Sequence, residues 1–161
     1  MSEDMAAVED EQSDPLEPDQ SRPDVYEVDS AGIDTELLTR DVVEVLWELK
    51  AMNVQALDLR GLVSYTDFVV IATGNSDRHV RALASHLDDE MDEAGWEATS
   101  IEGVETGRWA VLDYGDVVVH VFETRQRDLY DLESKWVDAE RLDFPDAPEE
   151  LYGHFQAERF E

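Results

Sequence analysis

The chain has 161 residues, and its 12 lysines and arginines oppose 41 aspartates and glutamates, for a formal net charge of -29 at pH 7. This length suffices for one domain with its own hydrophobic core, and the lack of cysteine excludes disulfides, thiolate metal sites and cysteine nucleophiles. Because so large a negative charge repels nucleic acid phosphates, we expect no direct nucleic-acid binding. We interpret the acidity either as a surface that binds a basic protein partner or as an adaptation to high salt.

Residues 1–34 are expected to form a disordered acidic arm. Pro15, Pro18 and Pro23 lie among acidic residues, and too few apolar side chains are present to offset the entropy cost of ordering. The arm has no basic stretch followed by an apolar run, as a secretory signal would, and no later stretch is long and apolar enough to span a membrane. We therefore expect a cytoplasmic protein without membrane contact.

An ordered domain is expected over residues 35–142, beginning with an amphipathic helix at roughly 36–52. Thr35 is a plausible N-cap. Apolar residues follow at steps of four and three, namely Leu38, Val42, Val45, Leu49 and Met52. Residues 54–60 and 67–73 then read as two strands, because each is largely apolar or β-branched and ends at a glycine.

Ser76 is expected to cap a second helix that ends near Gly95. Its apolar stripe is Val80, Leu83, Leu87 and Met91. A short third strand is expected at 96–101. A last helix is expected at roughly 127–137, with Leu129, Leu132 and Trp136 on one side.

The segments 108–113 and 116–122 flank Tyr114-Gly115 and predict a hairpin with a two-residue turn. Such a turn places Trp109 opposite His120 and Asp113 opposite Asp116 on one face of the sheet. The other face is small and apolar, as a surface under helices should be: Ala110, Leu112, Val117, Val119 and Val121. The first face is therefore a candidate binding surface, although the strand pattern alone suits a core role for Trp109 equally well.

Residues 143–161 form an acidic and aromatic C-terminal tail, in which Pro145 and Pro148 interrupt regular structure. Its aromatic residues predict partial docking of the tail on the domain.

Catalytic and metal-binding motifs are weak. The turn at 74–76 leads into a helix N-terminus, where an anion can bind, but the lysine of a phosphate loop is missing and Asp77 would repel the anion. The paired aspartates with which a nucleotidyltransferase holds magnesium are also missing. The four histidines lack the helical spacing that would let two of them share a metal ion. We expect no catalytic residue, no metal and no cofactor.

Several segments, taken in order, resemble the Iojap family of ribosome silencing factors over about residues 36–142. They are Gly74-Asn75-Ser76-Asp77-Arg78-His79-Val80, Glu102-Gly103, Trp109, Asp113-Tyr114-Gly115-Asp116-Val117-Val118-Val119-His120-Val121-Phe122 and Tyr130-Asp131-Leu132-Glu133. The resemblance implies an α/β fold with a single mixed sheet of about five strands flanked by helices. Its topology would be nucleotidyltransferase-like without the catalytic carboxylates, and the resemblance also implies a homodimer, which family members often form. Lys135 departs from the family pattern, which usually has an apolar residue there.

The resemblance further implies binding to the large ribosomal subunit through its ribosomal protein numbered fourteen, at the intersubunit face. The bound factor would block subunit joining and so repress translation under nutrient limitation. The implied contact residues are Trp109, Tyr114 and Tyr130. His120 shares the hairpin of Trp109 and Tyr114, and the neighbouring acids complement a basic surface: Glu102, Asp113, Asp116 and Glu133. Three alternatives remain: a large-subunit assembly factor, a nucleotide-binding enzyme that uses the turn at 74–76, and an acidic adaptor acting through its arm.

Overall fold

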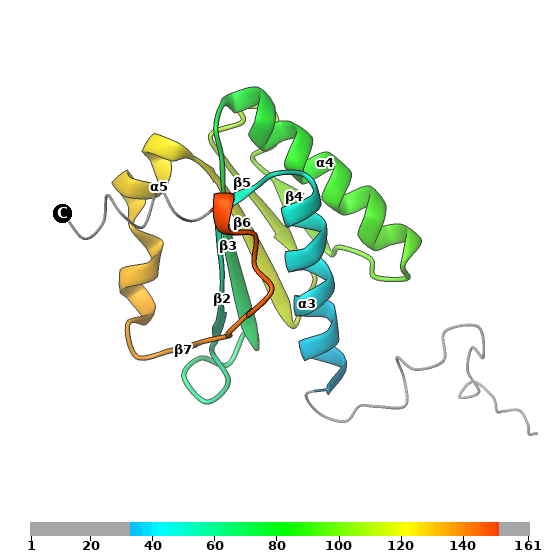
Figure 1. Ribbon diagram of the computed structural model, residues 1–161. Helices are drawn as coiled ribbons and strands as arrows, with labels where there is room; N and C mark the ends of the chain where they lie inside the picture. The colour runs from blue at the N-terminus through cyan, green and yellow to red at the C-terminus, as the bar shows by residue number, and fades with distance from the viewer. Residues whose placement is uncertain (1–32, 152–161) are drawn as a thin grey trace, which may run out of the picture. The chain divides into compact units, whose positions relative to one another are not determined.

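Residues 33–151 are described by the computed structural model of the chain. They form one mixed β-sheet of six strands flanked by helices (Figure 1). The expected α/β class is confirmed, and the sheet exceeds the expected five strands by a two-residue edge strand. Residues 1–32 of the expected arm and 152–161 of the expected tail lie outside the described part of the chain.

The strands are ordered β4-β5-β6-β3-β2-β7 across the sheet. Their bounds are Met52–Asp58 (β2), Phe68–Gly74 (β3), Ser100–Glu102 (β4), Trp109–Asp113 (β5), Val117–Glu123 (β6) and Glu140–Arg141 (β7). Strands β3 and β6 run parallel, and the other neighbouring pairs are antiparallel. Every residue of β3 is buried, as its continuous apolar sequence requires of a strand covered on both faces.

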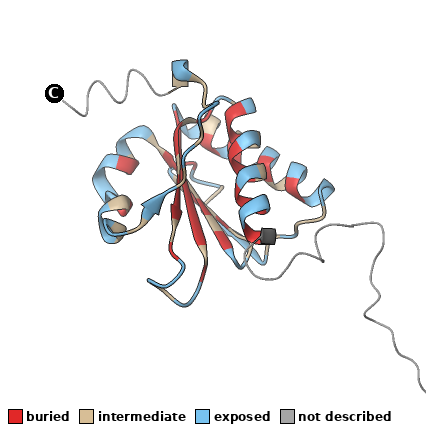
Figure 2. Ribbon diagram, turned by 60° about the horizontal axis from the view of Figure 1, so that its bottom comes forward, coloured by how far each residue is buried: buried red, intermediate tan, exposed pale blue. Residues whose placement is uncertain are grey.

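The helices divide the sheet into two unlike faces (Figure 1). Helices α3 (Ile33–Glu48) and α4 (Asp77–Glu93) cover one, which we call the α3/α4 face. Helix α5 (Thr124–Tyr130) and the 3-10 helix η3 (Leu132–Trp136) lie on the other, the α5 face. Figure 2 shows that buried positions concentrate on the strands and on the sides of α3 and α4 turned toward them. The apolar hairpin face packs under these helices as predicted, with Ala110, Leu112, Val117, Val119 and Val121 all buried.

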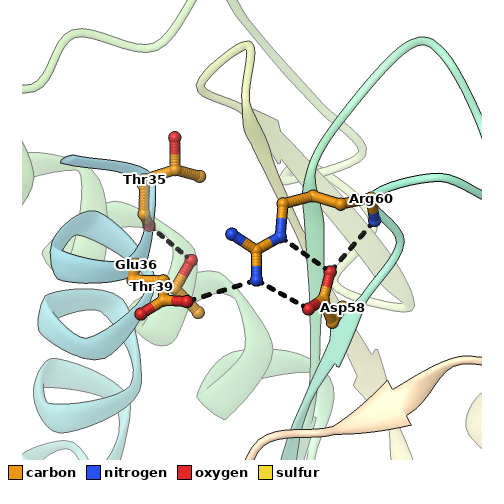
Figure 3. Close-up of polar contacts among 5 residues, drawn as sticks. All are labelled: Thr35, Glu36, Thr39, Asp58 and Arg60. Atoms are coloured by element: carbon orange, nitrogen blue, oxygen red, sulfur yellow. Dashed lines mark hydrogen bonds and ion pairs between the residues drawn. The ribbon is translucent and has the colours of Figure 1, made fainter. Parts of the chain in front are cut away.

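Helix α3 differs from the expected helix at both ends. It begins at Ile33, so Thr35 lies inside the first turn instead of capping it, and its carbonyl accepts a hydrogen bond from Thr39 Oγ1 at 2.8 Å (Figure 3). It ends at Glu48 because Lys50 adopts a left-handed φ of 68°, which redirects the chain. Met52 consequently begins β2, and the apolar period of the helix had merely run on into the strand.

Arg60 links α3 to the loop that follows β2 (Figure 3). Its guanidinium donates to Asp58 through Nε at 3.0 Å and through Nη2 at 2.8 Å, and to Glu36 through Nη2 at 3.2 Å. The hydrogen bonds from Arg60 to the Asp58 carboxylate hold the pKa of Asp58 below its ordinary value. Because the side chains stay partly exposed, such ion pairs contribute only about 0–1 kcal/mol each.

Helix α4 agrees closely with its prediction. Ser76 is the N-cap, and its Oγ accepts from the backbone N–H of His79 at 3.1 Å. The predicted stripe is buried, and Gly95 follows the helix with a φ of +100°. The third strand is shorter and later than expected, at Ser100–Glu102, while Trp96 packs on the core under α3 and α4.

The hairpin register is shifted by two residues from the predicted one. Trp109 lies opposite Phe122, and Asp113 lies opposite Val118. The cause is a wider turn, in which the backbone N–H of Tyr114 donates to Val117 O and Asp116 remains in the turn outside β6. A shift of two preserves the side of each residue, because side chains alternate along a strand.

The expected last helix is broken in two. Asp131 takes a left-handed φ of 45°, which ends α5 at Tyr130 and lets η3 start at Leu132. Leu132 is buried, but Leu129 is 71% exposed and does not share its face. The carboxylate of Asp131 accepts from Ser134 Oγ at 2.7 Å, which stabilises the break.

The segment after β7 returns to α3. Phe144 packs edge-on against Trp47, with ring centroids 5.6 Å apart, and Leu151 of the short helix η4 (Glu149–Leu151) contacts the same core. The rest of the expected tail lies outside the described residues. No helix within residues 33–151 is long and apolar enough to cross a membrane.

Candidate functional site

Four aromatic rings meet on the α5 face of the sheet. Trp109 opens β5, His120 and Phe122 lie on β6, and Tyr130 ends α5. The Trp109 ring centroid lies 4.7 Å from that of Tyr130, 4.9 Å from that of Phe122 and 5.9 Å from that of His120. We call these four residues the aromatic cluster. It runs from fully buried Phe122, through half-buried Trp109, to Tyr130, which is 51% exposed.

Trp109 therefore combines the two roles that the sequence left open, which are packing in the core and forming part of a binding surface. One side of its indole packs on the small core of the α5 face, and the remainder is accessible. A partly accessible tryptophan beside an exposed tyrosine is the composition typical of the centre of protein interfaces.

A hydrogen bond fixes the orientation of Trp109. Its Nε1–H donates to His120 Nδ1 at 3.0 Å. Burial, and secondarily the positive charge of Lys135, lower the pKa of His120 to about 4. The imidazole is therefore neutral at pH 7 and acts as an acceptor toward the indole.

A loop that precedes Trp109 is held by a close approach at Gly103. This residue has a φ of +84°, and a Cβ there would lie 2.0 Å from the carbonyl oxygen of Trp109. This clash, together with the positive φ, explains why position 103 requires glycine.

Gly103→Ala is expected to lower the free energy of unfolding by about 2 kcal/mol or more, since the clash adds to the cost of a positive φ. Gly115→Ala is the matched control, because its φ is +89° and nothing lies within 4 Å of the added Cβ. Urea unfolding of both variants measures the difference. Equal losses would show that the approach to Trp109 is not tight.

Glu133 is engaged in a buried ion pair. Arg127 of α5, only 3% exposed, donates to Glu133 Oε2 through Nη2 at 2.6 Å and through Nε at 3.0 Å. Its Nη1 donates to Thr73 Oγ1 and to the carbonyl of Asn53, both at 2.7 Å. Arg127 thus attaches α5 and η3 to the ends of β2 and β3. The Glu133 carboxylate is engaged in this attachment within the protein, and contact with an external partner is not its main role.

Sequence reasoning missed Arg127. On the single helix expected there, residues six apart point to different sides, so Arg127 and Glu133 would not meet. The break at Asp131 brings them together, and no local pattern signals it.

Two of the expected acids lie on the α5 face. Glu102 is exposed and stands opposite Val111, which in turn stands opposite His120. Residues directly opposite in antiparallel strands share a face, so Glu102 and His120 do. Asp113 follows Val111 by two residues on that face, and its Oδ1 accepts from Gly115 N at 2.8 Å. Asp116 is exposed in the hairpin turn, at the far end of the strands from Trp109.

Tyr114 lies on the opposite side of the sheet from Trp109 and Tyr130. Its ring packs against the core of the α3/α4 face, and its Oη donates to Asp88 Oδ1 of α4 at 3.4 Å. Burial, and then the nearby Asp88 carboxylate, raise the pKa of Tyr114 above its ordinary value. The structure therefore separates Tyr114 from the aromatic cluster.

The turn that suggested a nucleotide site has its polar groups paired internally. Ser76 Oγ caps α4, and Asn75 N donates to His79 Nδ1 at 3.0 Å. Thr124 Oγ1 donates to the carbonyl of Gly74 at 3.3 Å. In the described part of the chain, no three potential metal-binding side chains gather into a metal site.

Comparison with known proteins finds relatives of one kind. Residues 33–159 match the family model described as "Ribosomal silencing factor during starvation". The ribosomal silencing factor RsfS of Bacillus subtilis is 42% identical over 94 residues, which cover 58% of this chain and 80% of that protein. The chloroplastic protein Iojap of Zea mays is 34% identical over 98 residues, covering 61% of this chain and 42% of that protein. A crystal structure of a Chromobacterium violaceum protein has a TM-score of 0.62 and 35% identity, covering 68% of this chain and 91% of that chain.

Proposed function

The chain belongs to the family of ribosomal silencing factors, and from this premise we propose that it binds the large ribosomal subunit in the cytoplasm and blocks subunit joining. The contact is made with the ribosomal protein numbered fourteen at the intersubunit face, and translation is repressed when nutrients are scarce. The action is steric and needs no catalytic residue.

The aromatic cluster is the observation that carries this proposal. Trp109 and Tyr130 present accessible aromatic surface beside a buried ring, which favours a protein interface because aromatic anchors commonly contribute most of the binding energy. Glu102 and Asp113 lie on the same face and provide negative charge at its edge. The net charge of -29 favours a basic protein surface over nucleic acid as the part of the ribosome contacted.

Two of the three alternatives to this function have less support. A nucleotide-binding enzyme would use the turn at 74–76, but its hydroxyl and backbone groups are occupied by contacts within the chain. A role in large-subunit assembly uses the same binding surface and remains a secondary proposal. A homodimer is compatible with either role.

Cosedimentation tests the proposed function. The protein should pellet with isolated large subunits and not with intact ribosomes, because a steric block and a joined small subunit compete for one surface. Equal binding to both particles would contradict exclusion, and binding to neither would contradict ribosome binding.

The charge at the edge of the site should act on the association rate. Glu102→Gln is expected to slow association with large subunits by about two- to fivefold at low salt, with little change in dissociation, because rim charges steer encounter. The effect should fade as salt rises and screening shortens the attraction to about 8 Å. Stopped-flow measurements at several salt concentrations provide the rates.

Glu90→Gln is the matched control, since Glu90 is an exposed glutamate of α4, on the other side of the sheet. Asp116→Asn, at the hairpin turn, should fall between the two. If all three variants slow association equally, the acidity acts as a property of the whole molecule and not as a local patch.

A further inference from the structure

We propose that His120 carries its proton on Nε2 and offers this N–H as a hydrogen-bond donor to a carbonyl oxygen of the protein partner. The inference rests on the proposed function, because it assigns a partner chemistry to the same aromatic cluster. It gives His120 two simultaneous tasks, one toward Trp109 and one toward the partner.

The hydrogen bond from Trp109 determines which nitrogen of His120 carries the proton. An indole Nε1–H can only donate, so the His120 Nδ1 that receives it at 3.0 Å must be unprotonated. A neutral imidazole with an unprotonated Nδ1 has its single proton on Nε2. Burial and the nearby positive charge of Lys135 lower the pKa of His120, which agrees with a neutral ring.

The Nε2 nitrogen of His120 remains available to a partner. None of the hydrogen bonds found among residues 33–151 engages this nitrogen. The buried side-chain polar atoms of these residues that lack a partner are both on Asn53, so His120 Nε2 is not sealed inside the protein. The Nε2–H group of His120 is therefore a hydrogen-bond donor that remains accessible to solvent within the aromatic cluster.

The acceptor on the partner is expected to be an uncharged oxygen atom. A partner that covers the cluster removes water from Nε2, and an N–H left without an acceptor would weaken the complex. A phosphate or carboxylate is disfavoured, because the chain's net charge of -29 repels anions. A neutral carbonyl oxygen within a basic protein surface satisfies both conditions.

The tautomer can be tested on the free protein. Nitrogen-15 NMR of the imidazole at pH 7 should show a protonated Nε2 and an unprotonated Nδ1, and the Trp109 indole proton should be protected from exchange. A proton on Nδ1, or a doubly protonated ring, would overturn the inference irrespective of any binding result.

The donor is tested with isolated large subunits as the probe. In His120→Asn, the amide oxygen can replace Nδ1 as the acceptor for Trp109, but no group reaches the Nε2 position. We expect the dissociation constant to rise ~5- to 10-fold, the usual effect of one hydrogen bond, with the indole signal retained. His86→Asn, at an exposed position of α4, is the matched control and should bind like the parent.

A second variant guards against a folding defect. His120→Gln extends an amide N–H toward the Nε2 position, so it should bind more tightly than His120→Asn even though it loses the acceptor for Trp109. If the parent binds and His120→Asn binds equally well, the donor assignment is wrong and the proposed function stands. If the parent protein itself fails to bind large subunits, the proposed function is contradicted, and the donor assignment that rests on it is contradicted as well.

Discussion

Replacing Trp109 with alanine should abolish detectable binding to isolated large subunits while the domain remains folded. Trp109 contacts every other ring of the aromatic cluster, so its removal takes away the centre of the proposed interface. The loss of binding should exceed 2 kcal/mol, about 30-fold or more, as for central aromatic anchors. Sedimentation binding assays measure it.

The same variant should lose only about 2 kcal/mol of stability. This is less than the roughly 3–5 kcal/mol typical for a fully buried aromatic, because Trp109 is half-buried and its core is small. Trp96→Ala is the matched control, since Trp96 is also half-buried but packs on the α3/α4 face. It should keep full binding. An unfolded Trp109→Ala domain, or lost binding in both variants, would mean that Trp109 is a core residue and not an interface residue.

Arg127→Met should lower the free energy of unfolding by about 3–5 kcal/mol. The substitution leaves Glu133 without its cation, and it removes the donors to Thr73 and to the carbonyl of Asn53. Breaking one side of a buried ion pair commonly has a cost of this size. Urea denaturation followed by circular dichroism measures it.

Arg60→Met is the matched control, because Arg60 also holds two carboxylate contacts but is partly exposed. Its loss should amount to no more than about 1 kcal/mol. Adding Glu133→Gln to Arg127→Met should recover part of the stability, because the uncompensated charge is then gone. Equal effects of the two arginine variants would contradict the attachment of α5 through Arg127.

The attachment of α5 through Arg127 also positions Tyr130 for binding. Tyr130 is the last residue of α5, three residues after Arg127, and it lies on Trp109. Glu133, expected from sequence to meet the partner directly, is thus better interpreted as holding the helix that presents Tyr130.

Local patterns in the sequence were sufficient for the parts of the fold that depend on neighbouring residues. The cap and stripe of α4 follow from Ser76 and a helical period, and the structure has both. The two faces of the hairpin follow from alternation, which survives a register shift of two. The sequence placed Tyr114 in the turn, on neither face, and the resemblance to the family grouped it with Trp109; the structure places its ring against the core of the α3/α4 face.

Tertiary structure alone decided what depends on contacts between distant residues. The hairpin register was set by the turn and by pairing of β6 with β3, which starts at Phe68 opposite Val117. The break at Asp131 and the Arg127 ion pair were set by docking of α5 on the sheet, where burial requires a partner for the cation. The hydrogen bond from Trp109 to His120 likewise joins two strands. Periodicity reports which side of an element is apolar, whereas such partners depend on which elements meet and at what register.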